Sequence, residues 1–72
     1  MPEVNGIYRH YKGNVYQVVG IAKCSETKAK LVVYRSIKDH DEIWVRPHKM
    51  FVEDVVIDGV SQPRFSLLSC EG

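Results

Sequence analysis

The sequence predicts an all-β fold, a small SH3-like barrel of five or six short antiparallel strands with a short helical turn after the fourth strand. Nearly every segment is rich in Tyr, Val, Ile or Thr, which favour strands, and runs of good helix formers are scarce. Tight turns separate these segments at short intervals. A chain of 72 residues also has little material to cover sheet edges, which closure into a barrel would remove. An OB-like barrel is the alternative, although that fold usually needs a longer chain and a helix between strands three and four.

The first two strands are expected at residues 6–11 (GIYRHY) and 15–22 (VYQVVGIA), and a turn at residues 12–14 joins them. Gly and Asn tolerate positive φ, which suits this turn. A two-residue loop at its second and third residues would set Tyr11 opposite Tyr16, whereas a loop at its first and second residues would shift the register by one. Both registers are compatible with the sequence.

Two further strands follow a polar segment. Residues 23–30 (KCSETKAK) are polar and charged, and we expect them to form a mobile surface loop. The third strand is expected at residues 31–36 (LVVYRS) and the fourth at 42–46 (EIWVR), with a charged turn between them. The fourth strand is stopped by Pro47, which has no N–H to donate to a ladder.

A helical turn is expected at residues 48–51, where Met50 and Phe51 would plug one end of the sheet. Further on, an Asp-Gly pair at residues 58 and 59 lies between apolar runs and predicts a hairpin, from Val55-Val56-Ile57 to a return strand that reaches residue 68. Pro63 confines that return strand to an edge or to a bulge near it.

Strand alternation sorts the side chains of the third and fourth strands onto two faces. The aliphatic face, which we expect to form the core, carries Leu31, Val33, Ile43 and Val45. The opposite face carries Val32, Tyr34, Ser36, Trp44 and Arg46. In the first strand, Tyr8 and His10 share a face and could join this second group. Aromatic rings beside a guanidinium and an imidazole are typical of surfaces that stack on a ligand and hydrogen-bond to it.

The expected binding surface therefore comprises Tyr8, His10, Tyr34, Trp44 and Arg46, near the loop residues Ser25, Glu26 and Thr27. Trp44 would stack on the ligand, Arg46 would hold a carboxylate or phosphate in a bidentate fork, and His10 would hydrogen-bond. In the alternative interpretation, Trp44 only adds apolar cover to the barrel. Arg46 could then simply pair with Glu42 or Glu53.

The expected partner is a peptide segment of another protein or a small polar ligand such as a nucleotide. RNA or single-stranded DNA is the alternative, because a basic rim could lie beside the aromatic face, formed by Lys12, Lys23, Lys28 and Lys30. The formal charge of +1, from ten basic and nine acidic residues, excludes a histone-like polycation. We expect a monomer or a weak dimer.

Length and residue spacing argue against an enzyme. A chain this short buries only about 60% of the surface that it exposes when unfolded, which leaves no room for a large active-site cavity. A small hydrolase or transferase could use His10, Cys24 and Ser25, but no third orienting group or oxyanion-binding turn is recognisable. The two cysteines and three histidines have no zinc-ligand spacing, so we expect no metal and no cofactor.

The chain is expected to be a single domain over residues 1–72, with an ordered core at about 6–67 and a frayed tail. No apolar run approaches the ~20 residues that span a bilayer, and the N-terminus lacks the regions of a signal peptide. We therefore expect a cytosolic protein that does not contact the membrane. In that reducing compartment Cys24 and Cys70 would be free thiols.

Several short motifs occur together along the chain. They are Tyr8-Arg9-His10-Tyr11-Lys12-Gly13, Tyr16-Gln17-Val18, Ser25-Glu26-Thr27, Val32-Val33-Tyr34-Arg35, Trp44-Val45-Arg46-Pro47, Met50-Phe51, and Asp58-Gly59 followed by Pro63-Arg64-Phe65. This combination resembles a family of small bacterial domains of unknown function, over residues 6–67. Cys24 stands where members of that family often carry His. The resemblance implies a stand-alone β domain of the bacterial cytosol and brings no established activity.

Overall fold

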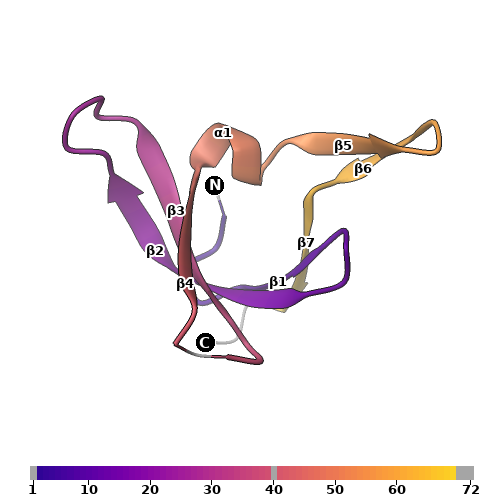
Figure 1. The fold of residues 1–72 in the computed structure, drawn as a ribbon, viewed down its shortest axis with the longest axis horizontal. Helices are drawn as coiled ribbons and strands as arrows, with labels where there is room; N and C mark the ends of the chain where they lie inside the picture. The colour runs from indigo at the N-terminus through magenta and orange to yellow at the C-terminus, as the bar shows by residue number, and fades with distance from the viewer. Residues whose placement is uncertain (1, 40, 70–72) are drawn as a thin grey trace.

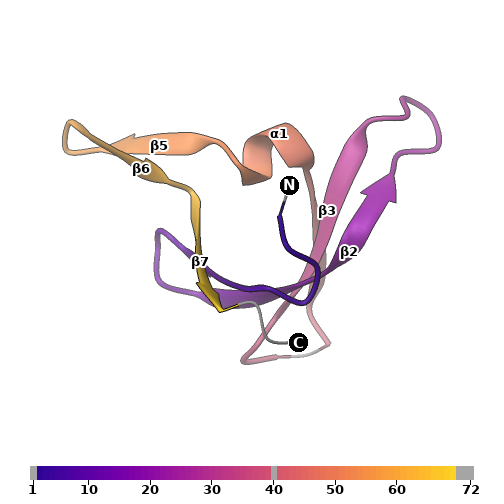
Figure 2. The same cartoon turned by 180° about the vertical axis from the view of Figure 1, so that it is seen from behind.

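The computed structural model describes residues 2–39 and 41–69, which form seven strands and one short helix. In chain order these are β1 (Ile7–His10), β2 (Val15–Lys23), β3 (Lys30–Ser36), β4 (Ile43–Pro47), α1 (His48–Phe51), β5 (Asp54–Ile57), β6 (Val60–Pro63) and β7 (Phe65–Ser69). Five strands form one antiparallel sheet in the order β4-β3-β2-β1-β7, and β5 pairs with β6 in a separate hairpin. Figures 1 and 2 show the large sheet bent into a trough, with α1 across its opening and the β5–β6 hairpin projecting to one side.

The all-β class and the helical turn after the fourth strand are confirmed. Closure into a barrel is not seen, because no ladder joins β4 to β7 within the part of the chain that the structure describes. The return strand of the last hairpin is also divided in two at Arg64, directly after Pro63. The predicted Asp58-Gly59 turn is confirmed, with φ values of 51° and 79° that suit a two-residue hairpin loop.

The turn between β1 and β2 differs from both registers that the sequence left open. Tyr8 lies opposite Tyr16, and the His10 N–H donates to the Asn14 carbonyl at 2.8 Å. The loop therefore has three residues, 11–13, and Gly13 takes a positive φ of 111° at its end. The two-residue loops were wrong because this bulged turn uses one more residue.

A β-bulge bends β2 in its middle. Val18 lies opposite Tyr34 and Gly20 lies opposite Val33, so Val19 is an extra residue without a partner in β3. The bulge lets both Val18 and Ile21 face the interior, although they are three residues apart. The N-terminal segment is tied to the same point, since Val18 exchanges backbone hydrogen bonds with Asn5 and Gly6.

The core is a cluster of aromatic rings inside the trough. Its buried apolar members are Tyr8, Val18, Val32, Tyr34, Phe51 and Phe65. The Phe51 and Phe65 rings stack with their centroids 4.0 Å apart, and the Tyr34 ring meets both edge-on. The predicted plug is confirmed for Phe51, which is 2% exposed, but Met50 is 42% exposed and does not contribute to it.

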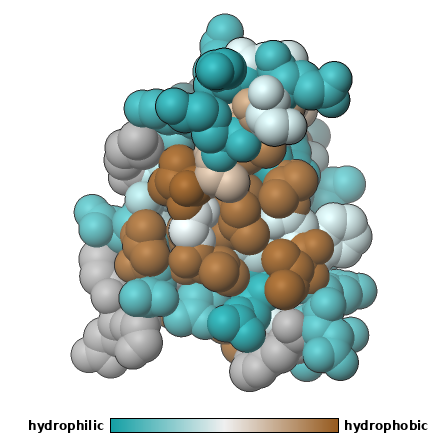
Figure 3. Space-filling view, turned by 90° about the vertical axis from the view of Figure 1, so that its left-hand side faces the viewer, coloured by the Kyte–Doolittle hydropathy of each residue, from teal (hydrophilic) through white to brown (hydrophobic). Residues whose placement is uncertain are grey.

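The expected assignment of core and solvent faces in β3 and β4 was wrong. Val32 and Tyr34 are buried, whereas Ile43 and Val45 are each 60% exposed. The physical reason is the curvature of the sheet: its concave side holds the aromatic rings, and its convex side is left exposed at β4. Figure 3 views the wall that contains β2 and β3 from outside and shows apolar side chains across its centre.

Candidate functional site

A pocket of about 240 Å³ opens on the concave side of the sheet, where β1, β2, β3, β4 and β7 each contribute a side chain. Its lining residues are His10, Lys12, Asn14, Tyr16, Tyr34, Trp44, Arg46 and Phe65. Strand register explains why they meet. Tyr34 is the cross-strand partner of Trp44, and His10 is the partner of Phe65, so each pair projects from the same face.

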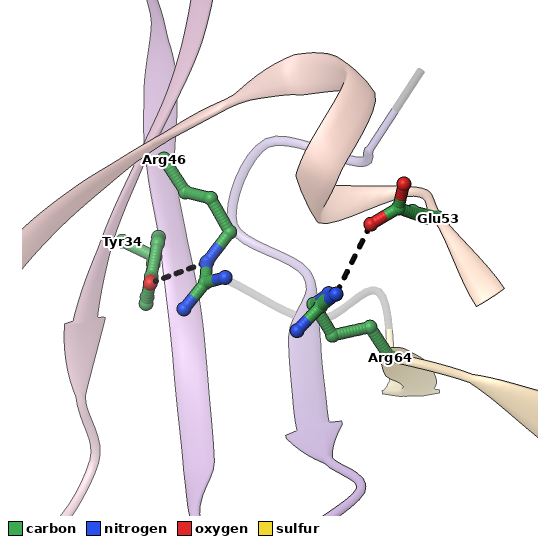
Figure 4. A network of polar contacts seen from close by, with 4 residues as sticks. All are labelled: Tyr34, Arg46, Glu53 and Arg64. Atoms are coloured by element: carbon green, nitrogen blue, oxygen red, sulfur yellow. Dashed lines mark hydrogen bonds and ion pairs between the residues drawn. The ribbon is translucent and has the colours of Figure 1, made fainter. Parts of the chain in front are cut away.

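The Arg46 side chain reaches from β4 across the floor of this pocket. Its Nε donates a hydrogen bond to the Tyr34 hydroxyl at 3.3 Å (Figure 4). Its guanidinium carbon lies 5.7 Å from the centre of the Phe65 ring. Both contacts orient the guanidinium without neutralising it. Glu53, one of the two expected carboxylate partners, pairs with Arg64 at 3.0 Å instead. Over residues 2–39 and 41–69, no carboxylate lies within ion-pair distance of Arg46.

His10 lies half-buried at the side of the pocket. Its ring meets the Phe65 ring edge-on at 4.9 Å, and its Nδ1 accepts the backbone N–H of Lys12 at 3.2 Å. Because Nδ1 is the acceptor, the neutral ring carries its proton on Nε2 and can donate from there. Burial lowers the pKa of His10 below 6.5, and the positive charges of Arg46, Arg64 and Lys12 lower it further. The neighbouring charges that act on His10 are thus all positive.

The chemistry of the lining is aromatic and cationic. Trp44 is 48% exposed and offers a ring face, while Arg46 and Lys12 supply positive charge. No aspartate or glutamate is among the lining residues in the described chain. Such a pocket suits an anionic group that is attached to a planar or apolar part.

The structure brings four of the eight expected site residues together in this pocket: His10, Tyr34, Trp44 and Arg46. Tyr8 lies on the same face but is only 8% exposed and does not line the pocket. Its hydroxyl accepts the backbone N–H of Glu3 at 2.9 Å, so it belongs to the core. Tyr34 is also buried, at 4%, and reaches the pocket chiefly through its contact with Arg46.

The loop residues Ser25, Glu26 and Thr27 do not belong to the pocket. They lie in the turn between β2 and β3, whereas the pocket uses the opposite ends of those strands, at Tyr16 and Tyr34. Roughly 26 Å of strand separates the two ends of the nine-residue β2. The structure therefore does not bring these three residues together with the other expected ones, because the turn of a hairpin lies at the opposite end from the free ends of its strands.

The same geometry separates the other groupings that the sequence allowed. Lys23, Lys28 and Lys30 surround the β2–β3 turn, so they do not continue the positive charge of Lys12 at the pocket. Cys24 also lies there, away from His10, and the two do not form a nucleophile and base. Hydrogen bonds from the Thr27 side chain, then from the Thr27 and Glu26 backbone, lower the pKa of Cys24 to about 7.

Four lining residues were not among the eight expected ones: Asn14, Tyr16, Phe65 and Lys12, which the sequence placed only in the alternative basic rim. Tyr16 could have been found from the three-residue turn, which sets it opposite Tyr8 on the concave face. Phe65 follows a strand break that the sequence marks only with Pro63.

The described residues contain no group of His, Cys, Asp and Glu that could hold a metal ion, and no helix among them is long and apolar enough to cross a membrane. Cys24 is a free thiol, and Cys70 lies outside the described residues.

The trough-shaped sheet, the helix that plugs it and the aromatic pocket together define a small all-β domain. Residues 6–67 match the model of the DUF1653 family, described as a protein of unknown function, and the chain belongs to that family. It is similar to the crystal structure of a DUF1653 protein from Bordetella bronchiseptica, with 33% sequence identity and a TM-score of 0.81. That similarity covers 90% of this chain and 86% of the other. No curated protein matches the chain.

Proposed function

We propose that this protein is a non-enzymatic binding module that takes the carboxylate or phosphate of a peptide segment or a small polar ligand into the pocket beside Arg46. One observation carries the proposal: the Arg46 guanidinium is held by Tyr34 and Phe65, faces the pocket, and has no carboxylate partner among the described residues. A guanidinium fixed in this way loses less freedom when it binds a planar anion.

Trp44 supplies the second half of the recognition. It is the cross-strand partner of Tyr34, so its ring and the Arg46 head project from the same face of the sheet. A ring or an apolar side chain attached to the anion would stack on Trp44. The lining residues of the described chain include no Ser or Cys that could act as a nucleophile, and no Asp or Glu whose carboxylate could act as a general base. This supports binding rather than catalysis.

The proposal can be tested by titrating the ¹⁵N-labelled protein with sodium benzoate, phenyl phosphate and benzyl alcohol, followed by NMR. The two anions are expected to cause saturable shifts at the pocket residues, and benzyl alcohol, which has the ring without the charge, is not. Arg46→Ala should abolish the shifts. Arg9→Ala is the matched control, because Arg9 is exposed and alternates with Tyr8 and His10 onto the convex face.

Equal loss of binding in the two arginine variants would mean that the anions respond only to net charge, and the proposed site would be rejected. Binding of benzyl alcohol as strong as that of benzoate would also contradict it, because the recognition would then be apolar.

A further inference from the structure

The outer edge of β4 is open. β4 pairs with β3 on one side, and within residues 2–39 and 41–69 no strand pairs with it on the other. Ile43, Trp44 and Val45 are 60%, 48% and 60% exposed, so the strand is also open to solvent on both of its faces. An exposed, apolar edge strand is a template for pairing with another strand.

The backbone groups at that edge can be identified from the hydrogen-bond pattern. The Ser36 N–H donates to the Glu42 carbonyl at 3.1 Å, which makes these two residues a hydrogen-bonded pair. Antiparallel pairs alternate between hydrogen-bonded and non-hydrogen-bonded. Trp44 and Arg46 therefore direct their backbone groups toward β3, while Ile43, Val45 and Pro47 direct theirs toward the open edge. Pro47 has only a carbonyl to offer there.

The edge can join the same edge of a second copy in three antiparallel registers, centred on residue 43, 44 or 45. They differ in how well the opposing residues match. Centring on Val45 would set Ile43 opposite Pro47, which cannot donate. Centring on Ile43 would set Val45 opposite Asp41, an apolar residue against a carboxylate. Centring on Trp44 sets Ile43 opposite Val45, and both residues have N–H and C=O groups to exchange. Pro47 then lies opposite Asp41 at each end of the pairing, with only a carbonyl to offer.

The Trp44-centred register is also complementary in its side chains. It sets Trp44 opposite Trp44 of the second copy at a close, non-hydrogen-bonded position, which suits an aromatic pair. It also sets Arg46 opposite Glu42 of the second copy, so the guanidinium that lacks a carboxylate within its own described chain meets one from outside. The other two registers do not form this pair of opposite charges.

We propose that two copies of this protein pair antiparallel through their β4 strands, in the register centred on Trp44. The two large sheets then continue as one, and Glu42 of the second copy lies beside the pocket of the first. This pairing does not depend on the proposed function, but the two share Arg46, so an anion bound in the pocket competes with Glu42 of the second copy.

Disulfide trapping tests both the pairing and its register. In a background with Cys24→Ser and Cys70→Ser, three variants each carry one cysteine on β4: Ile43→Cys, Trp44→Cys and Val45→Cys. In the proposed register the two residues at position 44 lie about 4.5 Å apart between Cα atoms, within the reach of a disulfide. The two residues at position 45 lie roughly 8–9 Å apart, beyond the ~7 Å limit. Trp44→Cys is therefore expected to give at least about fivefold more cross-linked dimer than either of its neighbours.

A charge exchange tests the same register without cysteine. Arg46→Glu should weaken the dimer seen by analytical ultracentrifugation, because it places two carboxylates opposite each other, and adding Glu42→Arg should restore it. The double variant lacks Arg46 and should still fail to bind benzoate. Restored dimer without restored binding thus separates the pairing from the proposed function.

Sedimentation of the wild-type protein as a monomer at millimolar concentration would overturn the pairing. Stronger trapping at position 43 or 45 than at position 44 would overturn the register. The NMR spectrum of each variant should keep the chemical-shift dispersion of the wild-type spectrum, which shows that the outcome is not caused by unfolding.

Discussion

Tyr34 and Arg46 are joined by one hydrogen bond, from the guanidinium Nε to the phenol oxygen at 3.3 Å, which links the core to the pocket. Tyr34 is 4% exposed and its ring meets Phe51 and Phe65 edge-on. The hydroxyl is therefore held by the packing of the core, and Arg46 takes its orientation from a group that cannot move freely. Recognition in the pocket depends in this way on the same rings that stabilise the fold.

Removing that hydroxyl should weaken binding and still leave a folded protein. Tyr34→Phe keeps the ring and loses one hydrogen bond, which costs about 1 kcal/mol of stability. Benzoate affinity should fall by about three- to tenfold, because Arg46 loses its fixed orientation. Tyr11→Phe is the control, since Tyr11 does not line the pocket. Unchanged benzoate affinity in Tyr34→Phe, measured by NMR titration, would show that the hydrogen bond does not orient Arg46.

Trp44 is expected to contribute to binding and little to stability. It is 48% exposed, so Trp44→Ala should leave a folded protein whose free energy of unfolding, measured by thermal denaturation, is within about 1 kcal/mol of the wild-type value. Loss of the stacking surface should lower benzoate affinity about tenfold. If circular dichroism showed that Trp44→Ala is unfolded, the residue would be part of the core and its assigned role would be wrong.

Phe51 and Met50 are neighbours in α1 that should respond very differently to truncation. Phe51 is 2% exposed and stacks on Phe65, so Phe51→Ala should cost about 3–5 kcal/mol and leave so small a domain largely unfolded. Met50→Ala removes a side chain that is 42% exposed and should cost under about 1 kcal/mol. Urea unfolding measures both. Similar losses for the two variants would contradict the position of the plug.

Gly6 is required by a close approach of the backbone. A Cβ at this position would lie 2.8 Å from the Glu3 carbonyl oxygen and 3.0 Å from the Tyr8 ring, so Gly6→Ala should destabilise the protein by about 1–3 kcal/mol. Gly20 offers the matched control, because a Cβ there meets no atom within 4 Å. Gly20→Ala should leave the urea midpoint nearly unchanged. An equal shift in both variants would argue against a steric role for Gly6.

His10 should make stability depend on pH just below neutrality. Its pKa in the folded protein is lowered from 6.5, mainly by burial and then by Arg46, Arg64 and Lys12. The unfolded chain therefore binds more protons as the pH falls below 6.5, and stability falls with it until the folded pKa is reached. His10→Gln should remove this part of the slope in unfolding curves measured between pH 7.5 and 5. If the dependence of stability on pH were unchanged in the variant, it would arise from groups other than His10.

Local sequence signals predicted much of the fold because the forces behind them are local. The Asp58-Gly59 pair tolerates the positive φ values that its turn needs, and Pro47 marks the end of β4. Alternation also grouped Tyr34, Trp44 and Arg46 correctly on one face, since cross-strand partners share a face.

Alternation could not tell which of those faces is buried. Both faces of β3 are apolar, with Leu31 and Val33 on one and Val32 and Tyr34 on the other. The choice is made by the curvature of the whole sheet, to which the bulge at Val19 contributes, and by the absence of a covering element over β4 in the described chain. These are tertiary effects that a period of two residues does not encode.

The most direct test of the proposed binding site is the position of bound benzoate, measured by intermolecular nuclear Overhauser effects on the labelled protein. Trp44 and Val45 are adjacent in β4 and project from opposite faces of the sheet, so the contacts distinguish the pocket from the convex surface. Contacts from the benzoate ring to the Trp44 indole and the Phe65 ring are predicted. Contacts to Ile43 and Val45 in their place would contradict the site.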